Sequence, residues 1–310
     1  MNVETQYLDL LEYVMKCGQD KGNRTGVKTR MTHGAVLRHN ADLGFPLLTS
    51  KKVNFQAIAA ELCWFLSGDT DCATLDELNP GGSNIWKANA KAWQEGPNGN
   101  KHMPETYCGY LYGMLWREFG VCNGGEFERS AKNDQIANVV RLICDDPQSR
   151  RILISNWDAA AHNDGAGDQL SCLPPCHLLC QFNIDEDEMR MDTSVYMRSA
   201  DLFLGVPFNL ASYALLAEII SYIVFCQSGK RYKPRMLVMF LNDAHIYHNH
   251  FEQVRTQLSR KNDLYKFPNL DIRPNIVLSV ESLGNPEFVM SALSLGDYKH
   301  HPYLRAEMAV

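Results

Sequence analysis

The 310-residue chain has no block of basic residues, because its 30 lysines and arginines are spread among 36 acidic residues and the net charge is −6. Proteins that follow a nucleic-acid backbone usually concentrate Lys and Arg on one face. The sequence therefore predicts no nucleic-acid partner. We expect any anionic ligand to be held by individual cations within a pocket.

The chain also lacks an apolar leader, since residues 1–5 read MNVET. Secretory signals carry an apolar stretch near this position. The most apolar stretch, residues 202–226, is long enough to cross a membrane, but it contains Pro207, Asn209 and Glu218. These residues favour a buried helix over a membrane span. Ten cysteines without a leader fit a reducing compartment, so we expect a cytoplasmic protein with no membrane partner.

Internal repeats, low-complexity tracts and flexible linkers are missing as well. A chain of this length with 45% hydrophobic residues can fill one large core. Some segments repeat apolar residues with a helical period, and others alternate apolar and polar residues. The sequence therefore predicts the α+β class, with residues 1–310 forming one domain.

The expected elements follow from these two periods. Helices are predicted over residues 4–17, 54–65, 134–144, 209–225 and 245–258, and strands over residues 152–157, 178–184, 188–197 and 237–241. Residues 79–101 are rich in Gly, Asn and Pro and are predicted to form surface loops.

Alternation along residues 188–197 puts the odd-numbered residues, including Met189 and Met197, on the core face, so Arg198 faces the other way. Arg150 and Arg151 precede the strand-like residues 152–157. Neighbours on a strand point to opposite faces, so at most one of these two arginines serves the pocket of its own subunit.

Cys176 is the candidate nucleophile. It follows Pro174-Pro175 and precedes His177, and Arg198 is within reach on the returning strand. A cation beside a thiol lowers the thiol pKa and increases the reactive thiolate fraction. A cysteine in an intracellular protein is, however, ordinarily a buried and inert thiol. The residues alone leave both interpretations open.

Two clusters resemble metal sites in spacing only. They are Cys172, Cys176 and Cys180, and His245, His248 and His250. Pro174 and Pro175 exclude the helix that would align the thiols. The histidines lack a completing ligand pattern, apart from Asp243. We therefore predict no metal, with a metal-dependent hydrolase as a distant alternative.

Motifs along nearly the whole chain resemble those of the thymidylate synthase family. In order, they are residues 23–26 (NRTG), 45–49 (FPLLT), 61–65 (ELCWF), 85–86 (IW), 149–151 (SRR), 173–177 (LPPCH), 198–209 (RSADLFLGVPFN), 243–247 (DAHIY) and 307–310 (EMAV). The resemblance implies the thymidylate synthase fold, a mixed β-sheet packed with helices that also forms a homodimer interface.

The resemblance also implies a reaction. In this family a cysteine thiolate adds to carbon 6 of dUMP, and carbon 5 then attacks the methylene of 5,10-methylenetetrahydrofolate, the co-substrate. Cys176 matches the nucleophile. Arg198, which opens the next motif along the chain, is counted with Cys176 among the catalytic residues. Asn209 matches the residue that reads the base edge. The residues that match the proton-moving network at carbons 4 and 5 are Glu61, Tyr112 and His177.

The resemblance also implies which residues contact the nucleotide and the folate. The phosphate contacts are Arg24, Arg198 and Ser199, with Arg150 and Arg151 reaching across from the second subunit of a homodimer. Arginine forks suit phosphate oxygens. His245 and Tyr247 match the pair that binds the sugar hydroxyl. The matching folate contacts are Lys51, Trp86, Asp201 and Val310.

The chain departs from the synthase pattern around the base. Met197 stands where synthases have glutamine, as in the phage deoxycytidylate hydroxymethylase, Tyr110 replaces a proline, Asn242 replaces a glycine, and the loop over residues 158–171 is longer. Exchanging a carboxamide for a thioether changes the hydrogen bonds that hold water. Met197 is therefore the candidate that determines the product.

The favoured product is 5-hydroxymethyl-dUMP, formed when water adds to the methylene on the base. This product would imply a virus with modified pyrimidines, acting in the host cytoplasm. Two alternatives stay open. One is an ordinary thymidylate synthase, which makes dTMP and dihydrofolate by hydride transfer. The other is an inactive nucleotide- or RNA-binding homologue. Asn209 favours dUMP over dCMP, since the deoxycytidylate hydroxymethylases carry aspartate at this position.

Overall fold

The computed structural model describes residues 2–23, 25–82, 84–96, 99, 102–121, 128–159, 161–162 and 170–308. Arg24 and Val310, two of the predicted ligand contacts, lie outside these residues. So does most of the longer loop, residues 158–171.

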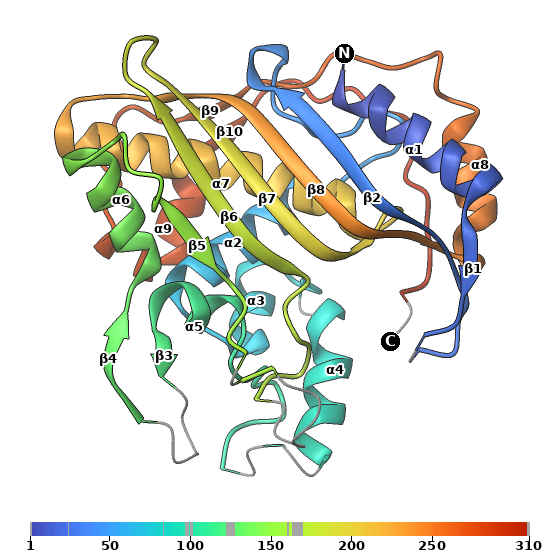
Figure 1. Cartoon of the computed structure of the whole chain (residues 1–310), viewed down its shortest axis with the longest axis horizontal. Helices are drawn as coiled ribbons and strands as arrows, with labels where there is room; N and C mark the ends of the chain where they lie inside the picture. Colours follow the sequence, from blue (N-terminus) through green and yellow to red (C-terminus); the bar gives the residue numbers. More distant parts are fainter. Residues whose placement is uncertain are drawn as a thin grey trace.

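A six-stranded mixed sheet forms one layer of the protein (Figure 1). Its strands, in spatial order, are β1 (Gln19–Lys21), β2 (Thr29–Asn40), β8 (Lys233–Tyr247), β7 (Arg190–Asp201), β6 (His177–Asp185) and β5 (Leu153–Ser155). Strands β7 and β8 are parallel, and the other neighbours are antiparallel. The expected α+β class is confirmed.

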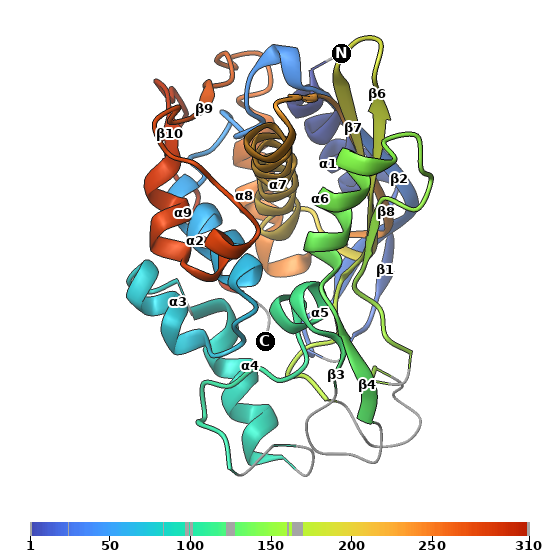
Figure 2. The same ribbon diagram turned by 90° about the vertical axis from the view of Figure 1, so that its left-hand side faces the viewer.

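The helices cover one face of this sheet (Figure 2). On β7, Met191, Val195 and Met197 point to that face and are buried, as their alternation predicts. Met189 is an exception, because it lies in the turn before β7 with a φ of 52°. A turn residue is not bound by the strand period.

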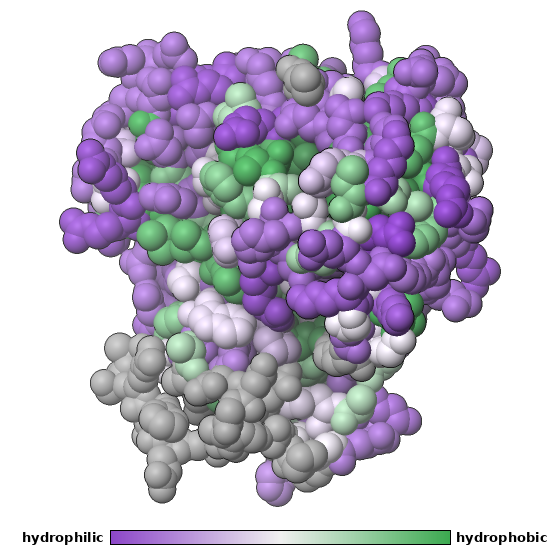
Figure 3. Space-filling view, turned by 45° about the vertical axis from the view of Figure 1, so that its right-hand side comes forward, coloured by the Kyte–Doolittle hydropathy of each residue, from purple (hydrophilic) through white to green (hydrophobic). Residues whose placement is uncertain are grey.

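No helix of the described residues covers the opposite face of the sheet (Figure 2). Tyr196 of β7 and Phe240 of β8 are 40% and 39% exposed there, and Val36 of β2 is 37% exposed. Figure 3, which looks partly onto this side, shows apolar side chains at the surface among polar ones. Large exposed apolar side chains on one flat face favour contact with another protein surface.

Helix α7 (Gly205–Ser228) lies between the sheet and the outer helices (Figure 2). It packs against β7 and β8 on one side and against α2 (Phe55–Ser67) and α6 (Gln135–Asp145) on the other. Among the described residues it is the one helix long and apolar enough to cross a membrane, but 67% of its most apolar stretch is buried within the protein. The expectation of a buried core helix is consistent with this burial.

The remaining elements surround this core or extend below it. They are α1 (Val3–Cys17), η1 (Ala41–Leu43), α3 (Cys72–Leu78), α4 (Asn84–Glu95), α5 (Tyr112–Arg117), β3 (Phe119–Val121), β4 (Glu128–Asn133), η2 (His248–His250), α8 (Phe251–Leu258), β9 (Leu270–Ile272), η3 (Glu281–Gly284), α9 (Pro286–Ala292) and β10 (Leu293–Leu295). Two helices begin with a side-chain cap, since the side chains of Asn54 and Asp134 accept hydrogen bonds from the first turns of α2 and α6.

Two expected elements are wrong. Residues 84–95 form helix α4 rather than a loop, because Trp86, Ala90 and Gln94 recur at helical spacing and are buried. The Gly and Pro residues that suggested a loop flank this helix. His245 lies on a strand rather than at the start of a helix, because β8 runs on to Tyr247 between β2 and β7. Pairing with two neighbours overrides the local sequence preference.

The placement of Arg150 and Arg151 also differs from the prediction. Both residues lie in a turn before β5, which begins only at Leu153, and both are exposed. The argument that they point to opposite faces of a strand therefore does not apply. Turn residues can direct both guanidinium groups away from the protein.

Candidate active site

Several of the predicted site residues lie at the ends of the two parallel strands. Ser199 and Asp201 close β7, and they pair in register with Asp243 and His245 of β8. Because parallel strands run in the same direction, their carboxyl ends meet at one edge of the sheet. The parallel pairing thus brings together two motifs that lie more than 40 residues apart in the sequence.

Cys176 lies in a loop that is held from two sides. Arg198 donates from Nε to the carbonyl of Pro175 and from Nη2 to that of Pro174, both at 2.8 Å. On the other side, the backbone N–H of Cys176 donates to the phenol oxygen of Tyr112 at 2.8 Å. The guanidinium is therefore fixed beside the residues that precede the thiol. A nearby fixed cation favours the thiolate form of a cysteine.

A pocket of about 270 Å³ opens beside this loop. Among the residues that line it are Cys176, Arg198, Ser199, Asp243, His245 and Tyr247, together with Lys21 from the end of β1 and Asn23 from the β1–β2 connection. Sequence reasoning missed Lys21, whose Nζ lies 3.1 Å from Oδ2 of Asp243. No motif contains Lys21, so only the strand pairing reveals it.

His245 is held by carboxylates at the end of β8. Its Nδ1 lies 3.0 Å from Oδ1 of Asp243, and the residue is 7% exposed. Burial alone lowers the pKa of His245, but Asp243 and Asp201 outweigh burial and the pKa is raised. The ring of Tyr247 meets the imidazole edge-on, with centroids 5.3 Å apart. The pair presents one imidazole and one phenol to the pocket.

Glu61 lies deeper, on α2. Its Oε1 accepts a hydrogen bond from Nε1 of Trp86 at 3.0 Å. Burial raises the pKa of Glu61 to about 7, although the bond from Trp86 favours the carboxylate. A carboxyl group with a pKa near neutrality can both accept and release a proton.

His177 lies against Tyr112 and Asn209. Its ring stacks on the Tyr112 ring, with centroids 4.9 Å apart and planes 27° from parallel. Burial lowers the pKa of His177 to about 4, despite a hydrogen bond with Asn209 that favours the charged form. The imidazole is therefore neutral near pH 7. Burial raises the pKa of Tyr112, so its phenol keeps its proton.

A second pocket, of about 510 Å³, adjoins the start of α7. Lys51, Ile85, Leu204, Phe208 and Tyr303 are among the residues that line it. The Lys51 ammonium donates to the carbonyl of Phe203, and burial lowers the pKa of Lys51 to about 7. Its apolar walls and single buried amine are typical of a site for a flat organic ligand with a polar group.

The side chains of Asp201 and Trp86 form hydrogen bonds with other groups of the protein. Oδ1 of Asp201 accepts from the backbone N–H groups of Phe203 and Leu204, at 2.9 and 3.3 Å. Trp86 donates to Glu61 and is 7% exposed. Neither residue is among those that line the second pocket.

Nine of the predicted residues line neither pocket, namely Glu61, Trp86, Tyr112, Arg150, Arg151, His177, Met197, Asp201 and Asn209. Arg150 and Arg151 lie in the exposed turn before β5 and line neither pocket. Met197 is 2% exposed in the core, next to His177 and Leu241 in the sheet. The core position predicted for Met197 is confirmed.

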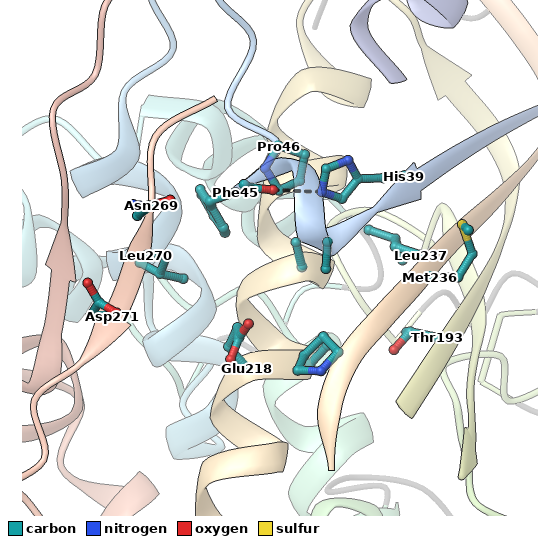
Figure 4. Close-up of a pocket in the computed structure, with 15 residues that line it drawn as sticks. His39, Phe45, Pro46, Thr193, Glu218, Met236, Leu237, Asn269, Leu270 and Asp271 are labelled. Atoms are coloured by element: carbon teal, nitrogen blue, oxygen red, sulfur yellow. Dashed lines mark hydrogen bonds between the residues drawn. The ribbon is translucent and has the colours of Figure 1, made fainter. Parts of the chain in front are cut away.

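A third pocket, of about 200 Å³, lies near the other end of β7 (Figure 4). Thr193, Glu218 and Asn269 are among its lining residues, and Nε2 of His39 lies 2.9 Å from the carbonyl of Gly44. Burial lowers the pKa of His39 to about 4. None of the predicted site residues lines this pocket.

The described part of the chain contains no group of three or more His, Cys, Asp or Glu side chains arranged to hold a metal ion. Cys172, Cys176 and Cys180 do not share one face. Cys180 is buried on β6, and Cys176 lies in the loop before that strand. The histidines at 245, 248 and 250 are divided between β8 and η2.

A family model described as thymidylate synthase matches residues 5–310. Members of this family transfer a one-carbon unit from methylenetetrahydrofolate to dUMP, and they are typically dimeric. Since the match covers all but the first four residues, the chain belongs to the thymidylate synthase family and is a folate-dependent one-carbon transferase.

Proposed function

We propose that this protein is a deoxyuridylate hydroxymethylase, which adds a hydroxymethyl group to carbon 5 of dUMP through a covalent adduct on Cys176. The observation that carries the covalent chemistry is the loop of Cys176, held between Arg198 and Tyr112. In the first step the thiolate forms a bond to carbon 6. The electron pair of the 5,6 double bond moves to carbon 5 and the carbon 4 oxygen, so carbon 5 becomes nucleophilic.

Asn209 and His177 support recognition of uracil. The carboxamide of Asn209 can donate to a carbonyl oxygen and accept from the ring N–H, whereas cytosine presents the opposite pattern. His177 is neutral and hydrogen-bonded to Asn209, which favours one orientation of the carboxamide. This arrangement favours dUMP over dCMP.

Glu61 is proposed as the group that exchanges protons near carbons 4 and 5. Its pKa of about 7 lets it release a proton toward the carbon 4 oxygen and later take one back. Tyr112 positions Cys176 through the backbone and stays protonated. Carbon 5 attacks the methylene of the folate, and its own proton is removed when the folate departs.

The first pocket is proposed to hold the nucleotide. Arg198 and Ser199 supply cationic and hydroxyl contacts to the phosphate, and His245 and Tyr247 bind the sugar hydroxyl. Arg24 is proposed to complete the phosphate site. The second pocket, which Lys51 lines, is proposed to hold the folate. Trp86, Asp201 and the terminal Val310 are proposed as further folate contacts from the family resemblance.

Arg150 and Arg151 are proposed to serve the partner subunit of a homodimer. They lie in the exposed turn before the edge strand β5, and neither lines the two pockets described above. The uncovered sheet face, with Tyr196 and Phe240 exposed, is the proposed dimer surface. When two copies join through this face, the turn that carries Arg150 and Arg151 in each copy is expected to face the other copy.

The choice of product rests on Met197. It pairs across the sheet with His177, which contacts Asn209. A thioether cannot donate a hydrogen bond there, whereas a glutamine can both donate and accept. Loss of that group favours a different arrangement of water near carbon 5. Addition of water to the exocyclic methylene yields 5-hydroxymethyl-dUMP and leaves tetrahydrofolate unoxidised.

Thymidylate synthase is the second candidate, and the burial of Met197 favours it. At 2% exposure the side chain acts as a packing residue, and it lines neither pocket. In that case tetrahydrofolate transfers hydride to the methylene and becomes dihydrofolate.

Incubation with dUMP and methylenetetrahydrofolate separates the two candidates. We expect a hydroxymethyl nucleotide and tetrahydrofolate by mass spectrometry, and no product from Cys176→Ala. Formation of dTMP with dihydrofolate would refute the hydroxymethylase. If the side chain at position 197 controls where water lies near carbon 5, a Met197→Gln variant is expected to shift the products toward dTMP.

A further inference from the structure

Three buried thiols meet beside the segment that carries Cys176. Cys72 begins α3, Cys108 precedes α5, and Cys172 lies four residues before Cys176. The thiols of Cys72 and Cys172 lie close enough to the Cys108 thiol to affect its ionisation, and the Cys108 thiol donates to the carbonyl oxygen of Thr106 at 3.6 Å. Cys72 and Cys108 are fully buried, and Cys172 is 8% exposed. The proposed reaction uses none of these thiols.

The backbone places Cys108 directly opposite Cys172. Gly109 and Ser171 form an antiparallel bridge, and the N–H of Cys172 donates to the carbonyl of Cys108 at 2.9 Å. Opposed residues in an antiparallel pair have Cα atoms ~4.5–5.5 Å apart and side chains on the same face. This separation falls within the ~4.4–6.8 Å that a disulfide spans.

Cys72 approaches from the other side of the same short ladder. The N–H of Cys108 donates to the carbonyl of Thr70 at 2.8 Å, and the N–H of Cys72 donates to that of Thr106 at 2.9 Å. Cys108 is thus central, with one thiol on each flank. Cys72 sits diagonally from Cys108, whereas Cys172 sits directly across, so Cys172 is the better-placed partner.

We propose that Cys108 and Cys172 are a site of reversible disulfide formation that restrains the active-site loop. Each cysteine lies four residues before a residue of the candidate site, Cys108 before Tyr112 and Cys172 before Cys176. The hydrogen bond from Cys176 to Tyr112 joins the same two segments at their far ends. A covalent link between the segments therefore changes the geometry of that bond.

The oxidant in this proposal is a peroxide. Cys172, which solvent reaches, attacks one peroxide oxygen as a thiolate. The S–O bond forms, the O–O bond breaks, and the departing hydroxide takes up a proton to give water. The neighbouring thiols of Cys172 and Cys72, together with burial, raise the pKa of the Cys108 thiol, so Cys108 stays protonated in the reduced protein.

Cys108 then attacks the sulfenic sulfur of Cys172. The S–S bond forms, the S–O bond breaks, and the thiol proton leaves with the second water. Two thiols are oxidised and one peroxide is reduced to two waters. A dithiol reductant reverses the bond by exchange, and Cys72 lies close enough to Cys108 to take part in that exchange.

The test is a disulfide map of the purified full-length chain. The protein is treated with hydrogen peroxide, alkylated with N-ethylmaleimide and digested without reductant. We expect a peptide pair joined through Cys108 and Cys172 that disappears after dithiothreitol. The same pair is expected in Cys176→Ala and in the matched control Cys63→Ser, which alters another fully buried cysteine. Absence of the pair, or a bond between Cys72 and Cys108 in its place, would overturn the assignment.

The restraint on the loop is tested by turnover of dUMP, and this arm alone rests on the proposed function. Oxidation is expected to lower turnover at least about tenfold and dithiothreitol to restore it, because misplacing a catalytic group by ~1 Å can cost up to ~10²-fold. Cys172→Ser is expected to resist this loss. An equal loss in Cys172→Ser would assign the effect to Cys176 and overturn the restraint. The disulfide is read by mass, so a failure of the proposed function leaves that result distinguishable.

Discussion

The phenol oxygen of Tyr112 accepts a hydrogen bond from the backbone N–H of Cys176 at 2.8 Å, and a second from that of His177 at 3.3 Å. One side chain thus supports the backbone of both residues. Tyr112 begins α5, and the ring of Phe65 lies 4.9 Å from its own. The position of the nucleophile therefore depends on how α5 packs against α2.

Removing that phenol oxygen is expected to slow turnover. In Tyr112→Phe two partly buried N–H groups lose their acceptor, which costs about 1–3 kcal/mol of stability. Turnover is expected to fall ~10- to 100-fold, with a smaller change in KM, because the thiol is misplaced while the pocket walls remain. Tyr222→Phe, which removes a hydrogen bond to Ile276 at 2.9 Å, is the matched control. Unchanged kcat in Tyr112→Phe would contradict this role.

Glu61 is expected to make stability depend on pH. Its unfolded carboxyl ionises near 4.5 and the folded one near 7, so between these values only the folded state holds the proton. The stabilising effect is complete below pH 4.5 and is lost as the pH rises through 7, by on the order of 3 kcal/mol. Urea unfolding at several pH values should show this fall in wild type relative to Glu61→Gln. If the free energy of unfolding depends on pH in the same way in both proteins, Glu61 does not cause the fall in stability.

Gly109 is expected to be essential for the approach of two chain segments. Its φ is 79°, and an added Cβ would lie 2.2 Å from the carbonyl oxygen of Leu170. Gly109→Ala is expected to lose more than the ~1–3 kcal/mol of backbone strain alone. Gly229→Ala is the control, because its φ of 75° is similar but its Cβ would meet open space. Equal losses in urea unfolding would show that the contact with Leu170 is unimportant.

Asn209 is expected to set the preference for uracil. In Asn209→Asp the side chain loses its N–H donor, so kcat/KM for dUMP is expected to fall by about 10² or more relative to dCMP. The same exchange at the exposed Asn183 should leave both values unchanged. Competition between the two nucleotides in one tube measures the ratio directly. An unaltered ratio would remove Asn209 from base recognition.

Sharing of arginines between subunits predicts complementation. A protein with Arg150→Ala and Arg151→Ala is expected to be weakly active, and Cys176→Ala inactive. After subunit exchange at equal amounts, hybrid dimers hold one complete site each, so activity is expected to return to about a quarter of wild type. The control carries all three changes in one chain and is mixed with Cys176→Ala. No recovery in the first mixture would mean that each chain uses its own arginines.

Local patterns predicted the elements that are stabilised by near neighbours in sequence. The helices predicted over residues 54–65 and 134–144 and the alternation along β7 are all found in the structure. Helix α4 was missed because its glycine and proline neighbours resembled a loop. The end of β8 was misassigned because two flanking strands extend it to Tyr247.

The sequence by itself determined the chemical groups and the family to which they belong, because the motifs keep their order from residue 23 to the end of the chain. Only the tertiary structure decided which groups meet. Glu61 finds Trp86 and Cys176 finds Tyr112 across 25 and 64 residues of chain, and Lys21 reaches Asp243 across 222. Such contacts depend on the packing of whole strands and helices, and no short segment encodes them. The pKa values of Glu61 and His177 likewise follow from burial, which is a property of the folded chain.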